Sequence, residues 1–167
     1  TFGSEAWRFA KVAGCDAVGE NYAQEVVAKA ADVASADRLP VHFIGQLQSN
    51  KARAVAEYAR VIHSVDRDSL VIALARVERP LDVFLEVNLT DDAGRGGVEP
   101  SGLLALAERV LEHPSLTLRG VMAVAPVGDE PRAAFARVKE LSNLVRTVAP
   151  TATDISAGLS GDFAEAI

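Results

Sequence analysis

Val41-His42-Phe43-Ile44-Gly45-Gln46-Leu47-Gln48-Ser49-Asn50-Lys51 contains the sharpest change of character in the sequence. An apolar run over residues 41–45 stops abruptly, and residues 46–51 that follow are polar except for one leucine. An Ala-rich helical pattern begins directly after them. This order is typical of a buried strand that ends in a loop facing something other than core, and loops on rigid scaffolds carry function. The stretch therefore predicts a site at the C-terminal end of this strand.

Short β-rich runs alternate with longer helical runs along the whole chain. We expect strands at residues 17–19, 41–45, 61–64, 82–89, 117–123 and 153–156. We expect helices at residues 2–13, 24–34, 52–59, 67–76, 101–112 and 131–148, and another from residue 161 onward. Gly14 is expected to end the first helix, and Asp66 to cap the fourth. Strict alternation of apolar strands with helices predicts a parallel sheet covered by helices.

Two closures of such a sheet fit this alternation, an open doubly wound sheet and a (β/α)8 barrel. No Gly-x-Gly-x-x-Gly motif follows any expected strand, which disfavours the dinucleotide-binding version of the open sheet. The first residue is not Met and residues 163–167 end within a helical pattern, so we expect both ends to be cut. Six strand–helix units, together with the segments expected beyond both ends, would make the eight units of a barrel. We therefore predict an α/β fold, a (β/α)8 TIM barrel, with residues 1–167 as a single domain that is incomplete at both ends.

Composition narrows the classes of partner and compartment. The net charge is −6, and no cluster of Lys and Arg forms a stripe, so nucleic acid is not expected as a partner. No window approaches the roughly 18 consecutive apolar residues of a membrane span, and no signal peptide is visible. The single cysteine, Cys15, excludes an internal disulfide and fits a reducing compartment. We expect a cytoplasmic protein without a membrane partner.

The turn at Ser156-Ala157-Gly158-Leu159-Ser160-Gly161-Asp162 has the clearest chemistry of the strand ends. Free backbone N–H groups and two hydroxyl groups at the start of a helix suit an anion such as phosphate. The alternative is that Ser160 only caps the helix, with Asp162 favourable in its first turn. The turn alone favours capping. Its position near the last strands of a barrel favours a phosphate site, because barrel phosphate sites commonly follow strands seven and eight.

Other polar residues lie at or near strand ends without a motif of their own. His42 and His63 could each serve as ligand, base or ring partner, or could be interior histidines satisfied by neighbours, and no metal spacing joins them to Cys15. Glu86 alternates with apolar residues, so we expect it to point into the barrel and to need a partner there. Arg95 lies in a Gly-flanked loop, where it is either an anion contact or a solvated charge.

Six segments occur in the order found in one known family. They are Gly-Glu-Asn-Tyr-Ala-Gln-Glu at 19–25, His-Phe-Ile-Gly-Gln-Leu-Gln-Ser-Asn-Lys at 42–51, Ile-His-Ser-Val-Asp at 62–66, Glu-Val-Asn-Leu at 86–89, Gly-Val-Met-Ala at 120–123 and the turn at 156–162. Across nearly its whole length the chain resembles the pyridoxal 5′-phosphate (PLP) homeostasis protein family of YggS/PROSC type. The resemblance implies a fold-type III barrel related to the N-terminal domain of alanine racemase, with PLP at the C-terminal ends of the strands.

The same resemblance implies a set of cofactor-binding residues, no catalytic residue and no metal ligand. The set comprises Asn21 near the 3-hydroxyl group of PLP, His42 and Met122 near its ring, and Ser156, Ser160 and the backbone at Gly158 around its phosphate. The assignments of Asn21, His42 and Met122 depend mainly on the resemblance. The phosphate assignment agrees with the chemistry of the turn itself.

The sequence departs from the family pattern in three places. The family's Schiff-base lysine lies in an Ala-Val-Ser-Lys-like segment before the helix at 2–13, and no such segment is present. The family's last strand, with an Arg near the pyridine nitrogen, has no counterpart after residue 167. We expect both segments to belong to residues outside this sequence. Arg95 stands where many relatives have Lys. None of the four lysines of the sequence is assigned the role of the Schiff-base lysine, although Lys51 is near the expected mouth of the barrel. The four are Lys11, Lys29, Lys51 and Lys139.

Three functions remain open at this point. The leading one is a PLP-binding protein of intracellular vitamin B6 homeostasis without established catalysis, a monomer that makes at most transient contacts with PLP-dependent enzymes. The second is a fold-type III PLP-dependent racemase or decarboxylase, although such enzymes usually add a β-rich second domain for which 167 residues leave no room. The third is a barrel that has lost the cofactor and serves in protein–protein interaction.

Overall fold

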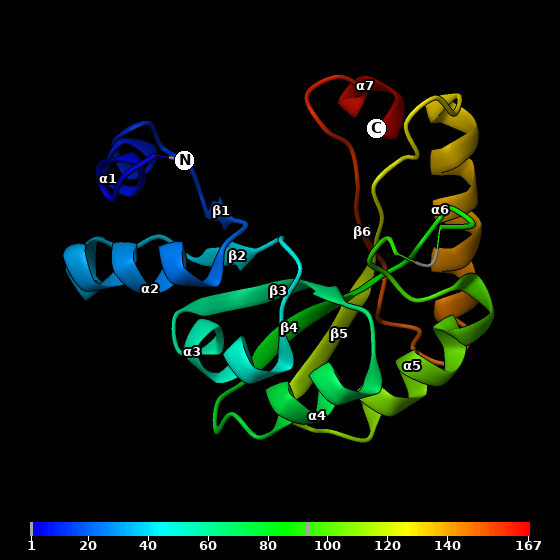
Figure 1. The fold of residues 1–167 in the computed structure, drawn as a ribbon, viewed down its shortest axis with the longest axis horizontal. Helices are drawn as coiled ribbons and strands as arrows, with labels where there is room; N and C mark the ends of the chain where they lie inside the picture. The colour runs from blue at the N-terminus through cyan, green and yellow to red at the C-terminus, as the bar shows by residue number, and fades with distance from the viewer. Residues whose placement is uncertain (1, 93) are drawn as a thin grey trace.

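Six parallel strands form one curved sheet in the computed structural model, which describes residues 2–92 and 94–167. The strands are β1 (Val18–Glu20), β2 (Val41–Phe43), β3 (Ala59–Val65), β4 (Leu81–Glu86), β5 (Leu116–Met122) and β6 (Asp154–Ser156). Each pairs with its neighbour in chain order, so every connection is a parallel crossover. The sheet curls into a half-barrel, with β1 and β6 as its edges among the described residues (Figure 1). The predicted alternation of six strands with helices is confirmed.

Helices occupy the connections between the strands. They are α1 (Glu5–Val12), α2 (Ala23–Asp32), α3 (Ala52–Ala56), α4 (Asp68–Ala75), α5 (Leu103–Leu111), α6 (Pro131–Val145) and α7 (Phe163–Ala166). Three short 3-10 turns, η1 (Ser35–Asp37), η2 (Ser49–Lys51) and η3 (Pro100–Gly102), complete the described elements. Helices α3, α4 and α5 lie along the outer side of the curved sheet, while α7 lies beyond the end of β6 (Figure 1). None of the helices among the described residues has the length and apolar character needed to cross a bilayer.

The core has two parts because successive strand residues point to opposite faces of the sheet. The larger part fills the space between sheet and helices, with fully buried side chains such as Phe43, Ile62 and Leu85. A smaller cluster of Val61, Phe84 and Met122 lies on the concave face. Parallel strands with apolar residues on both faces require this double cover. The concave cluster therefore forms the floor beneath the C-terminal ends of the strands.

Several predicted boundaries differ from the structure at strand ends. The strand expected at 41–45 ends at Phe43, and Ile44 is already 42% exposed. The strand expected at 82–89 ends at Glu86. The prediction that Asp66 caps α4 is wrong, because the helix begins only at Asp68 and the Asp66 carboxylate instead accepts a hydrogen bond from Arg67. Gly14 ends α1 as predicted, with a left-handed φ of 79°.

Candidate functional site

A pocket of about 240 Å³ opens at the C-terminal ends of β1, β5 and β6. Its lining comprises Asn21, Ile44, Met122, Ala123, Val124, Ser156, Ala157, Gly158 and Leu159. Four of the six residues predicted to bind a cofactor therefore lie together here, namely Asn21, Met122, Ser156 and Gly158. Parallel strands deliver their C-terminal residues to one edge of the sheet, so residues far apart in the chain meet at this edge.

Glycine at two positions shapes the pocket. A Cβ atom at residue 45 would lie 2.0 Å from the carbonyl oxygen of Asn21, so only Gly45 allows the loop after β2 to approach the loop after β1. Gly158 has a left-handed φ of 88°, which favours glycine. A Cβ at residue 158 would also lie 3.2 Å from the Cα atom of Phe163. These glycines let the loops that hold Asn21 and Ser156 fold closely around the pocket.

The turn after β6 leaves hydrogen-bond donors unused. The backbone N–H groups of Gly158, Ser160 and Gly161 have no partner within residues 2–92 and 94–167. The carboxylate of Asp162 accepts a hydrogen bond from the N–H of Leu159, which holds the turn in its bend. Ser160 is exposed, lies outside the pocket lining and makes no capping bond to α7, so the capping alternative is wrong. Its role at a phosphate stays a prediction.

His42 does not line the pocket but is linked to its lining through His63. Its Nδ1 atom is 3.0 Å from Nε2 of His63 on β3, and Nδ1 of His63 is 2.8 Å from Oγ of Ser156 on β6. The His63 ring stacks on Phe84, with ring centroids 4.5 Å apart and an angle of 11° between the planes. Residues 63 and 156 are separated by 93 positions, so no local pattern in the sequence could indicate this contact.

Burial shifts the pKa of each of these titratable groups on the concave face in the direction that favours its neutral form. Burial lowers the pKa of His63 to about 4, and the nearby charge of His42 acts in the same direction. Burial also lowers the pKa of His42, although Asp82 opposes this effect. Burial raises the pKa of Glu86 to about 7, helped by Asp66 and opposed by arginines 95 and 67.

Glu86 points into the half-barrel as predicted, since it shares a face with Phe84 and pairs in register with Met122. The partner that it was expected to need is absent among the described residues, because its Oε2 atom is buried without a hydrogen bond. The neighbouring Arg95 donates a long hydrogen bond of 3.5 Å to the carbonyl oxygen of Ala125. Lys51 ends η2 and lines a separate depression against α2, outside the pocket.

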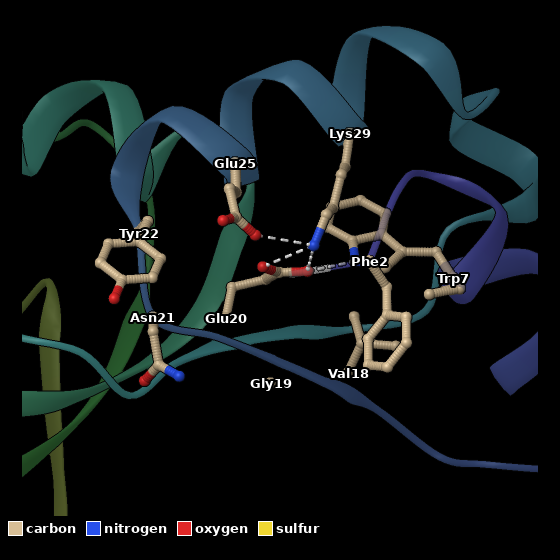
Figure 2. Close-up of a pocket in the computed structure, with 10 residues that line it drawn as sticks. Phe2, Trp7, Val18, Gly19, Glu20, Asn21, Tyr22, Glu25 and Lys29 are labelled. Carbon is tan, nitrogen blue, oxygen red and sulfur yellow. Dashed lines mark hydrogen bonds and ion pairs between the residues drawn. The ribbon is translucent and has the colours of Figure 1, made fainter.

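A second and larger pocket, of about 520 Å³, lies between α1, β1 and α2 (Figure 2). Its centre is Glu20, which accepts a hydrogen bond from Nε1 of Trp7 at 2.7 Å and two from Nζ of Lys29 at 2.8 and 3.0 Å. Lys29 also bonds Glu25 at 3.0 Å. The i,i+4 spacing of Glu25 and Lys29 could have indicated their pairing, but not the link to Glu20. Asn21 lines both pockets.

The hydrogen bonds in this cluster decide the charge of its lysine. Burial alone would lower the pKa of Lys29. The hydrogen bonds and charges of Glu20 and Glu25 outweigh burial and raise it above the ordinary value. Lys29 is therefore a charged, paired lysine that holds α2 to β1.

Comparison with known proteins identifies relatives that match nearly the whole of this chain. The model of the alanine racemase N-terminal domain matches residues 3–166. The pyridoxal phosphate homeostasis protein of Pseudomonas aeruginosa is 41% identical over 97% of this chain and 72% of that protein. The protein of the same name from Vibrio cholerae is 39% identical over 98% of this chain and 73% of that protein.

Solved structures agree with the sequence relatives. PipY of Synechococcus elongatus with PLP bound superposes with a TM-score of 0.89 at 32% identity, covering 99% of this chain and 81% of PipY. An alanine racemase from Clostridium difficile superposes with a TM-score of 0.72 at only 11% identity, covering 94% of this chain and 42% of the racemase, which is a likeness of fold alone. The predicted α/β barrel fold is thereby confirmed, as a half-barrel of six strands. The chain belongs to the pyridoxal phosphate homeostasis protein family.

Proposed function

We propose that this protein binds PLP in the pocket at the ends of β1, β5 and β6 and serves in intracellular PLP homeostasis without catalysing a reaction. The observation that carries the proposal is the convergence of Asn21, Met122, Ser156 and Gly158 on one pocket. PipY, at 32% identity, has a structure with PLP bound, and the sequence relatives are named pyridoxal phosphate homeostasis proteins.

The groups around the pocket fit the chemistry of PLP. A phosphate needs hydrogen-bond donors, and the Ser156 hydroxyl with the unpaired N–H groups of the turn after β6 provides them. Met122 offers an apolar surface for the pyridine ring, and the amide of Asn21 can bond the 3-hydroxyl group. When bound, PLP supplies an aldehyde that condenses reversibly with amines.

Each residue of the pocket then has a binding role. Ser156 and the N–H groups of Gly158 and Ser160 hold the phosphate, and Met122 with Asn21 orients the ring. His42 does not line the pocket and supports it through its hydrogen bond with His63. Because Ser160 is exposed, we assign its contribution to its backbone N–H more than to its hydroxyl group.

The lining of the pocket favours a carrier over a racemase or decarboxylase. Both reactions require a side chain that moves a proton at the substrate. The described residues that line the pocket include no acid and no histidine. His63 is close, but both of its ring nitrogens are already in hydrogen bonds. These observations support a protein that holds and releases the cofactor.

We further propose that residues 1–167 belong to one domain of a cytoplasmic monomer that contacts PLP-dependent enzymes only transiently. The unpaired, exposed Cys15 fits a reducing compartment. The net charge of −6 and the absence of a basic stripe in the sequence support a protein that does not bind nucleic acid.

The test is PLP titration of the full-length protein, followed by its visible absorption spectrum. We expect saturable binding with a visible band that borohydride abolishes. Absence of binding at saturating PLP would contradict the proposal. Racemisation and decarboxylation assays on the PLP-loaded protein with a panel of amino acids then separate the two functions, because turnover in either assay would favour the enzyme.

A further inference from the structure

A hydrogen-bonded chain of three side chains crosses the concave face beneath the pocket. It runs from Nδ1 of His42 to Nε2 of His63 over 3.0 Å, and from Nδ1 of His63 to Oγ of Ser156 over 2.8 Å. The chain joins β2, β3 and β6, which are not all neighbours in the sheet. Of its three members, Ser156 lines the pocket. A group bound in the pocket can therefore act on these three hydrogen-bonded side chains through Ser156.

Counting protons leaves two possible directions for the hydrogen bonds among His42, His63 and Ser156. A neutral imidazole has one N–H donor and one acceptor nitrogen, so His63 donates to one neighbour and accepts from the other. In the first arrangement, His42 donates to His63, and the Nδ1–H of His63 donates to Ser156. In the second, Ser156 donates to Nδ1 of His63, and the Nε2–H of His63 donates to His42. Both arrangements contain the same number of protons.

The surroundings of His63 restrict it to these two states. The side chain is only 8% exposed, so water cannot readily replace either partner. Its stacking on Phe84 fixes the plane of the ring. Burial lowers the pKa of His63 to about 4, so the ring is neutral near neutral pH. The neighbours of His63, and not solvent, therefore determine which ring nitrogen carries the proton and which accepts a hydrogen bond.

We propose that His63 is a positioning residue that directs the hydroxyl proton of Ser156 toward an anionic group in the pocket. This inference rests on the proposed function, in which the phosphate of PLP lies at Ser156. A phosphate oxygen accepts hydrogen bonds, so Ser156 donates to it and cannot also donate to His63. The first arrangement is thereby selected, with His63 protonated at Nδ1. Without His63, the hydroxyl of Ser156 loses the donor that fixes its rotation.

Comparing PLP with pyridoxal, which lacks the phosphate, tests this role by binding. In the full-length protein, we expect His63→Leu to weaken PLP binding about tenfold and pyridoxal binding by less than about twofold. His63→Asn, whose amide N–H lies near the position of Nδ1, should recover part of the loss. His113→Leu, two residues after the end of α5, is the matched control and should change neither affinity. Equal losses for both ligands, or no loss for PLP, would overturn the inference.

A measurement on the unsubstituted protein does not depend on whether these variants fold. Nitrogen-15 NMR of the histidine rings in the PLP-saturated protein should show His63 protonated at Nδ1. Protonation at Nε2 would overturn the positioning role while leaving PLP binding in place. Absence of saturable PLP binding by the unsubstituted protein would instead overturn the proposed function together with this inference.

Discussion

Glu20 and Glu86 both end strands of the same sheet, yet their surroundings are opposite. Glu20, the last residue of β1, is 5% exposed and accepts three hydrogen bonds from Trp7 and Lys29. Glu86, the last residue of β4, has a buried oxygen with no hydrogen-bond partner within residues 2–92 and 94–167. Burying a charge is costly unless it is paired, which agrees with the hydrogen bonds around Glu20, whereas burial raises the pKa of the unpartnered Glu86 to about 7.

The contrast extends to two pockets, one lined by Glu20 and the other by Met122, the register partner of Glu86. The larger one, of about 520 Å³, is built around charges that already satisfy one another. The smaller one, of about 240 Å³, is built around neutral side chains and backbone donors that still lack partners. The two pockets therefore differ in chemistry as well as in size: the larger holds an internal ion-pair network, whereas the smaller adjoins backbone donors without partners among the described residues.

The largest expected effect comes from breaking the charged cluster. Glu20→Gln leaves the buried ammonium of Lys29 with less compensation and should lower the free energy of unfolding by about 3–5 kcal/mol, measured by urea denaturation. Asp37→Asn is the matched control, because it breaks the exposed pair with Lys11 and should cost less than about 1 kcal/mol. Similar losses from both substitutions would contradict the structural role of the cluster.

The next effect is a pH dependence caused by Glu86. Its pKa rises from 4.5 unfolded to about 7 folded, so the folded state holds the proton more tightly. Stability should therefore fall as pH rises from 4.5 to about 7, by up to about 3 kcal/mol. Glu86→Gln should remove this fall, so the difference between the two unfolding curves isolates it. Parallel curves for variant and parent would show that Glu86 is not held neutral.

The smallest effect concerns the phosphate donors. Ser156→Ala should weaken PLP binding by about tenfold, or ~1.4 kcal/mol, in equilibrium titration of the full-length protein. Ser160→Ala should have a smaller effect, because its hydroxyl lies outside the pocket. Ser35→Ala, an exposed position in η1, serves as control and should bind PLP like the parent. A larger loss at Ser160 than at Ser156 would place the phosphate outside the pocket.

Local patterns in the sequence predicted the order of elements well, because strand and helix periodicity depends on neighbouring residues. Boundaries were less predictable, as at 41–45, where Ile44 is apolar but already exposed. The grouping of Asn21, Met122, Ser156 and Gly158 followed from the family resemblance and from the rule that parallel strands share one functional edge. The bonds of His63 with Ser156 and of Lys29 with Glu20 could not be predicted, because the first depends on how the sheet curves and the second on how α2 packs against β1.

The most direct test of the central claim is a crystal structure of the full-length protein with PLP. We predict the phosphate beside Oγ of Ser156 and the N–H of Gly158, with the ring against Met122. A phosphate seated instead in the pocket of Trp7, Glu20 and Lys29 would contradict the account.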